Sequence, residues 1–102
     1  MGPAESTFER IRFGDYHSLA DVATGRFLDD FEGEVQRTFG VEADELRLVG
    51  RSRNWVLLTA PYRDGRSLSP SNSSAFVRMQ KVGGVWKLEH IWISRRRRSS
   101  YD

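Results

Sequence analysis

The sequence AFVRMQKVGGVWKLEHIWI, residues 75–93, contains two runs of alternating apolar and polar side chains joined by Gly83-Gly84. Two glycines between such runs are typical of a β-hairpin with a two-residue turn. With that turn, Val82 pairs with Val85, and every residue further out has a fixed partner. The stretch therefore predicts a hairpin and, through its register, which side chains share a face of the sheet.

Upstream of the hairpin, the spacing of apolar side chains changes once. In residues 26–39 they recur at intervals of three and four, which is typical of a helix with one apolar face. After Gly40 the interval becomes two and predicts strands at 46–49 and 55–60. Helices followed by a meander of about four strands predict an α+β fold, with N-terminal helices packed on a bent antiparallel sheet. Four acidic residues and Arg37 are among the remaining positions of the helix. The acidic residues are predicted to form a solvated outer face or a dock for a basic partner: Asp29, Asp30, Glu32 and Glu34.

The excess positive charge of this chain is concentrated at its C-terminus. The 102 residues include 16 Lys or Arg and 14 Asp or Glu, a formal net charge of +2. Without residues 95–102, which hold four Arg and one Asp, 12 basic and 13 acidic residues are left, so the body has a charge of −1. We therefore expect a single domain at residues 1–94 and a disordered basic tail at 95–102. The tail is predicted either to solubilise the protein or to bind nucleic acid or an anionic membrane weakly.

The residue inventory excludes several kinds of chemistry. The chain has no cysteine, so it has no disulfide, thiolate metal site or thiol nucleophile. Its two histidines, His17 and His90, are 73 positions apart and lack metal-ligand spacing. No glycine-rich phosphate loop or nucleophile elbow is present. We expect no metal and no cofactor.

No stretch has the length and apolar character of a membrane span or of a signal peptide. The composition favours a cytoplasmic protein. The extracytoplasmic part of a protein that is anchored upstream is the alternative.

Counting outward from the turn places His90 opposite Val77 and Trp92 opposite Ala75. This face is the predicted core and carries Ala75, Val77, Met79, Trp86, Leu88 and Trp92, with His90 in its middle. An imidazole in such a place needs a hydrogen-bond partner or a pocket that holds water. We interpret His90 as a structural residue, with a polar anchor in an apolar pocket as the alternative. The predicted pocket residues are His90, Trp86, Trp92 and Phe31.

The opposite face of the same hairpin pairs Arg78 with Glu89 near the turn and is apolar further out. If the helices cover the first face, this second face stays open, and exposed apolar patches usually mark interfaces. The predicted interface residues are Trp55, Phe76, Ile91 and Ile93. We therefore expect a homodimer or another protein partner on this face.

The segment Gly84-Val85-Trp86-Lys87-Leu88, placed after helices and strands, resembles the last hairpin of the nuclear transport factor 2-like superfamily, which commonly reads Gly-x-Trp-Lys-Ile. Ala23-Thr24-Gly25-Arg26-Phe27 also looks like the second-helix region of that superfamily. The resemblance covers residues 5–94 and implies a strongly bent sheet that wraps a helix into a cone around an apolar pocket. Its members include small cyclases, isomerases and dehydratases with an Asp/His or Asp/Tyr arrangement, and non-catalytic modules for binding or dimerisation.

The short chain fits the non-catalytic branch better, so the leading prediction is a non-enzymatic interaction module, homodimeric, with a small apolar pocket and no assigned catalytic residue. One alternative is a small enzyme of the same fold that uses His90 with Asp15 or Tyr16 for proton transfer. The other is a nucleic-acid-binding accessory protein that acts through its basic tail. The arginines of that tail are Arg95, Arg96, Arg97 and Arg98.

Overall fold

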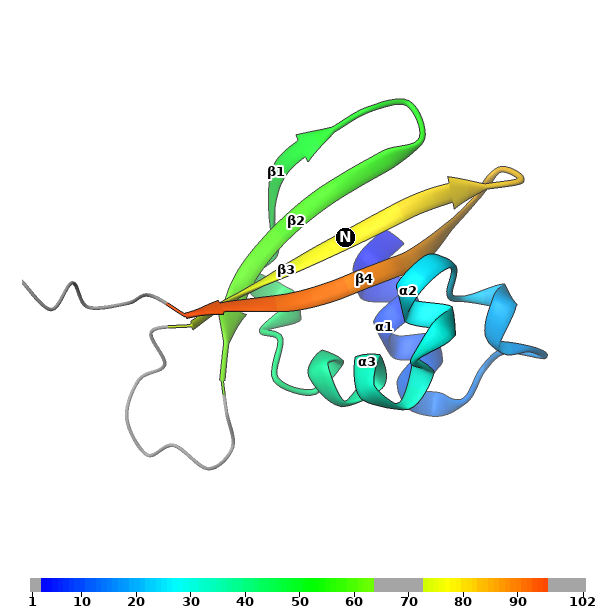
Figure 1. The fold of residues 1–102 in the computed structure, drawn as a ribbon, viewed down its shortest axis with the longest axis horizontal. Coiled ribbons are helices and arrows are strands. Elements are labelled where there is room, and N and C mark those ends of the chain that lie inside the picture. Colours follow the sequence, from blue (N-terminus) through cyan, green and yellow to red (C-terminus); the bar gives the residue numbers. More distant parts are fainter. Residues whose placement is uncertain (1–2, 64–72, 96–102) are drawn as a thin grey trace, which may run out of the picture.

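Four antiparallel strands form one open sheet in the order β1-β2-β3-β4, and a helical layer precedes them in the chain (Figure 1). The structure is a computed structural model and describes residues 3–63 and 73–95. The helices are α1 (Pro3–Phe13), α2 (Gly25–Asp29) and α3 (Phe31–Thr38), with 3₁₀ turns at Leu19–Asp21 and Ala43–Glu45. The strands are β1 (Arg47–Arg51), β2 (Trp55–Tyr62), β3 (Ser73–Val82) and β4 (Val85–Arg95). The predicted α+β fold is confirmed.

The Gly83-Gly84 turn is present as predicted. Both glycines have positive φ, 58° and 80°, which a two-residue hairpin turn of this kind requires. The pairing from Val82–Val85 out to Met79–Leu88 also follows the predicted register.

Beyond Leu88 the predicted register is wrong, because β4 contains a β-bulge. Arg78 pairs with His90, so that Glu89 is an extra residue without a partner in the ladder. Side chains alternate between the two faces of a strand, and one extra residue therefore exchanges the faces of everything that follows. The pairs after the bulge are Val77–Ile91, Phe76–Trp92 and Ala75–Ile93.

The helices pack on one face of the sheet, mainly against β4, and β1 and β2 extend away from them (Figure 1). The core lies between these two layers. Its largest fully buried apolar side chains are Phe8, Phe27, Met79, Leu88 and Ile91. Within residues 3–63 and 73–95, no helix packs on the opposite face of the sheet (Figure 1).

The single helix expected at residues 26–39 is two helices, α2 and α3. Asp30 separates them with φ −133° and ψ 63°, which is not a helical conformation. Within α3, Glu34 lies on the same side as Phe31, Val35 and Thr38 and is only 2% exposed, whereas Phe39, at the C-terminal end of the helix, is 60% exposed. The prediction that Glu34 lies on a solvated outer face is therefore wrong.

The boundary predicted before the basic tail shifts by one residue. Arg95 is the last residue of β4 and pairs with Ser73. Residues 96–102 lie outside the described part of the chain, as does most of the loop predicted between β2 and β3. In the described ranges, none of the helices has the length and apolar character needed to cross a bilayer.

Candidate functional site

Glu34 on α3 and His90 on β4 form a side-chain pair at the edge of the sheet. His90 Nδ1 lies 2.7 Å from Glu34 Oε2, and the backbone N–H of Ile91 donates to Glu34 Oε1 at 2.9 Å. The Glu34 side chain is 2% exposed and the His90 side chain 23%. Arg37 Nη1 lies 3.3 Å from Glu34 Oε1 and also donates to the carbonyl oxygen of Ile91 at 3.3 Å. Both oxygens of this buried carboxylate are therefore hydrogen-bonded, as a buried charge requires.

These contacts close the free edge of β4. At Ile91, Glu34 accepts the outward N–H and Arg37 binds the outward carbonyl. At Leu88, the N–H donates to the carbonyl of Val22 at 2.9 Å, and the carbonyl accepts the N–H of Thr24 at 2.8 Å. Exposed strand edges invite pairing with other chains, so an edge occupied at two positions is protected from it. His90 thus has the hydrogen-bond partner that its surroundings demand.

The alternative catalytic residues have other contacts. The carbonyl of Asp15 accepts from Arg10 Nε at 3.1 Å, and the side chain of Asp15 is exposed. The ring of Tyr16 packs edge-on against Phe31, with 6.0 Å between centroids. The carboxylate that pairs with His90 is Glu34, which the sequence analysis assigned to solvent.

The four predicted pocket residues are not brought together. Phe31 packs edge-on against Phe27 in the helical layer, with 5.6 Å between ring centroids. Trp92 pairs with Phe76 on the opposite face of the sheet. Trp86 lies near the hairpin turn, where the ammonium of Lys81 is 5.9 Å from its ring centroid. The predicted pocket is therefore divided between two faces of the sheet.

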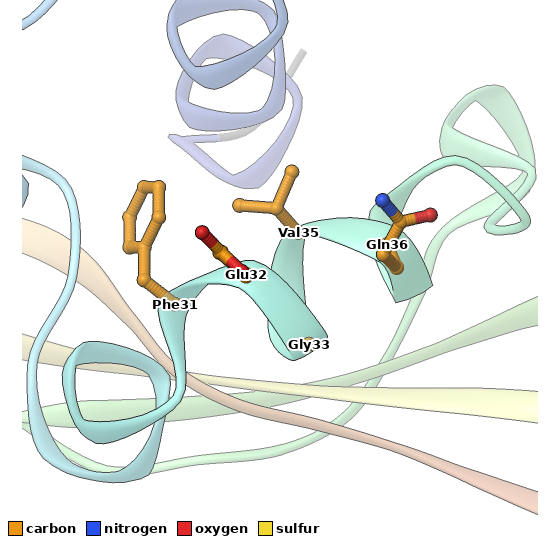
Figure 2. Close-up of a pocket in the computed structure, with 5 residues that line it drawn as sticks. All are labelled: Phe31, Glu32, Gly33, Val35 and Gln36. Carbon is orange, nitrogen blue, oxygen red and sulfur yellow. The ribbon is translucent and has the colours of Figure 1, made fainter.

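An open hollow does adjoin α3, and Figure 2 shows the side chains of Phe31 and Val35 on one side of that helix. The hollow is lined by Phe31, Glu32, Gly33, Val35 and Gln36. His90 is not among these residues.

Three carboxylates near the start of the sheet, Glu42, Asp44 and Glu45, lie within 4.8 Å of one another. Arg63 Nε already binds Glu42 at 2.6 Å, and the other two are exposed. We assign no ion to them.

The sheet face that the helices leave uncovered, called here the open sheet face, is defined by its cross-strand pairs. Residues paired directly across antiparallel strands share a face. Three rows cross this face, and all of their side chains are at least partly exposed. The first row is Arg47, Thr59, Phe76 and Trp92. The second is Leu57, Arg78 and His90. The third is Trp55, Gln80 and Lys87.

Flat groups dominate the contacts on the open sheet face. The Trp92 ring stacks near-parallel on Phe76, with 5.4 Å between centroids and 16° between planes, and on His90, with 5.3 Å and 23°. Arg78 Cζ lies 5.0 Å from the centroid of Trp55, a cation–π contact. Arg78 Nε also binds Glu89 Oε1 at 2.7 Å, so the predicted Arg78–Glu89 contact exists although the two residues are not paired in the ladder.

The bulge places two of the four predicted interface residues on the other face of the sheet. Trp55 and Phe76 lie on the open sheet face, as expected. Ile91 is 0% exposed in the core, and Ile93 pairs with buried Ala75, so these two residues are on the helix side of the sheet. Trp92 takes their place. The sequence contains a signal for this exchange, since Leu88 and Ile91 are three positions apart rather than two, separated by two polar residues.

The charges of the protein are divided between its two layers. Residues 3–45, which contain the helices, carry eleven acidic and four basic side chains, a formal charge of −7. Residues 46–63 and 73–95, which contain the strands, carry one acidic and eight basic side chains, a formal charge of +7. The body has almost no net charge, but its negative and positive charges are concentrated in different layers.

Comparison with known proteins gives no assignment: no family model, no curated protein and no solved structure matches this chain. The resemblance to the nuclear transport factor 2-like superfamily stays a prediction. The function is therefore argued from the residues of the structure.

Proposed function

We propose that this chain is a non-enzymatic binding module whose binding surface is the open sheet face. One observation carries the proposal: Trp55, Phe76 and Trp92 are partly exposed on a sheet face that no helix of the described residues covers. Large aromatic side chains contribute most of the binding energy in many interfaces. An exposed group of them usually marks a binding site.

The Glu34–His90 pair supports a structural role better than a catalytic one. A general base needs a pocket that brings a substrate proton within reach. Here Nδ1 of His90 is bound to Glu34, and the imidazole ring is stacked on Trp92. Both carboxylate oxygens are engaged at the edge of β4. The arrangement holds α3 against the sheet.

Charge disfavours the symmetric homodimer that the sequence analysis predicted. In a two-fold dimer the same face of both copies meets. The basic residues of the rows, Arg47, Arg78 and Lys87, would then lie opposite the same residues of the second copy, and juxtaposed like charges oppose association. We therefore propose a partner other than a second copy.

The test compares the purified full chain with two variants, Trp92→Thr on the open sheet face and Phe39→Ser on the helical layer. Phe39 is 60% exposed and is a matched control for the loss of an aromatic ring. Each protein is immobilised, exposed to cell extract, and the bound proteins and nucleic acids are identified. We expect one class of partner to be lost from Trp92→Thr and kept by Phe39→Ser. Equal retention by all three proteins, or no retention above the empty support, would contradict the proposal.

The same preparations in light scattering test the homodimer. We expect a monomer at micromolar concentration. A dimer that dissociates in Trp92→Thr would restore the predicted homodimer in place of our proposal.

A further inference from the structure

The open sheet face is basic as well as aromatic. Its rows contain Arg47, Arg78 and Lys87 and no acid; Glu89, the unpaired bulge residue of β4, is bound to Arg78. The strand layer around it has a formal charge of +7. Positive surfaces of this kind attract polyanions, phosphate chains above all.

The rings on this face are arranged for planar partners. The ring of Trp92 is near-parallel to the ring of Phe76 and to that of His90, with 16° and 23° between the planes. A further flat ring can extend such a stack at its exposed end. Nucleobases stack on aromatic side chains and on arginine planes, whichever base they are.

The two aromatic groups are separated along the strands. Phe76 belongs to the first row, and Trp55 pairs with Gln80 in the third, four residues further along β3. Four residues of a strand span roughly 13 Å. The row between them contains Arg78. A chain that crosses from one aromatic group to the other therefore passes over a guanidinium.

From these observations we infer that the partner of the open sheet face is a single-stranded nucleic acid. Bases stack at Trp92 with its neighbours and at Trp55, while phosphates bind Arg78, Arg47 and Lys87. The inference rests on the proposed function and names its partner.

Single strands fit this face better than the competing polyanions. Reading a duplex requires an element that enters a groove, such as a protruding helix or ribbon, whereas single strands present unpaired bases for stacking on a sheet. An acidic peptide could bind the charges, but most of its side chains have no planar ring to stack. A peptide that adds a strand at β4 would meet an edge that Glu34, Arg37 and the segment 22–24 occupy; the other edge of the sheet is β1.

The decisive measurement is fluorescence anisotropy of the full chain with labelled single-stranded RNA and DNA of about 16 nucleotides, the upper range of known site sizes. We expect salt-dependent binding that Trp92→Thr weakens about tenfold, because a stacking position is lost. Trp92→Phe is expected to keep most of the affinity. Lys87→Gln should weaken binding to every sequence and lower the salt slope by about 1.

Glu89→Gln is expected to change the affinity in the opposite direction. It replaces the carboxylate that is bound to Arg78 with an isosteric amide, and we expect binding to tighten by severalfold. A residue with a merely structural role would not produce this gain. Phe39→Ser on the acidic layer is the matched control and is expected to bind like the unaltered chain.

Four results would overturn the inference: no binding of either oligonucleotide, equal affinity for a duplex, full affinity in both Trp92→Thr and Lys87→Gln, or loss of binding only when residues 96–102 are deleted. If oligonucleotides fail but a protein partner is still lost with Trp92→Thr in the extract experiment, the binding module stands and its partner is a protein. If both experiments fail, the proposed function fails as well. Should Trp92→Thr not fold, Trp92→Phe and Glu89→Gln still decide the outcome.

Discussion

Replacing Glu34 with alanine tests how much the contact between α3 and the edge of β4 stabilises the fold. The substitution leaves the N–H of Ile91, a residue with 0% exposure, without its acceptor. An unsatisfied buried donor costs about 1–3 kcal/mol. The loss of the contact to His90 and the space left by the carboxylate add to this. We expect Glu34→Ala to lower the free energy of unfolding by about 2–4 kcal/mol.

Two companion variants separate hydrogen bonding from charge and helix propensity. In Glu34→Gln the amide oxygen still accepts from Ile91, and the amide NH₂ can donate to Nδ1 of His90, so we expect a loss of only about 1 kcal/mol. Glu32→Ala, on an exposed position of the same helix, should change stability by less than about 0.5 kcal/mol.

The assay is urea unfolding followed by circular dichroism and tryptophan fluorescence, with hydrogen exchange at the amide of Ile91 as a local readout. For a domain of this size, 1 kcal/mol corresponds to a shift of about 4–8 °C in the melting temperature. Glu34→Ala should also accelerate exchange at Ile91 more than at the paired β3 amides. The reasoning is refuted if Glu34→Ala unfolds like Glu32→Ala, or if the glutamine variant is the less stable of the two.

Two further predictions concern the packing of the helical layer and its response to acid. In Gly40→Ala the new Cβ would collide with a ring carbon of Tyr62. We expect the free energy of unfolding, measured in urea, to fall by about 1–3 kcal/mol. Unchanged stability would mean that the backbone at Gly40 can move away from Tyr62 without cost. The backbone N–H groups of Ser18 and His17 donate to the Asp21 carboxylate and lower its pKa below the ordinary value. Asp21 therefore stabilises the fold above its unfolded pKa of about 3.9, and this contribution is lost as pH falls through the lower folded pKa. Acid unfolding of Asp21→Asn should accordingly depend less on pH below about 4 than that of the unaltered chain, and parallel curves would contradict this.

The difference between the expected and the observed face of β4 comes from one local irregularity. A regular alternation along β4 would place His90 and Trp92 in the core. The bulge at Glu89 instead puts Trp92 on the open sheet face and Ile91 in the core, because one extra residue in a strand changes the face of every residue that follows. Glu34 is buried for another reason: within α3 it lies three and four positions from Phe31 and Thr38, on the side of the helix that faces the core.

The partner of His90 cannot be predicted from local sequence patterns. Glu34 is 56 positions away in the sequence, and its approach depends on how α3 docks against β4. The apolar neighbours of His90 in the sequence indicate that its imidazole needs a partner. The identity of that partner depends on the docking of α3, which results from packing among several elements.

Local patterns were enough to predict the α+β class, the hairpin and its turn, because these depend on residue spacing, glycine geometry and neighbouring residues. The excess of acids before residue 46 and of bases after it is also visible in the sequence. The packing of the elements is needed to see that these charges belong to two layers and that Trp92, Phe76 and Arg78 share the uncovered face. A face of a sheet is formed by paired strands, and the pattern of one strand does not contain the pairing.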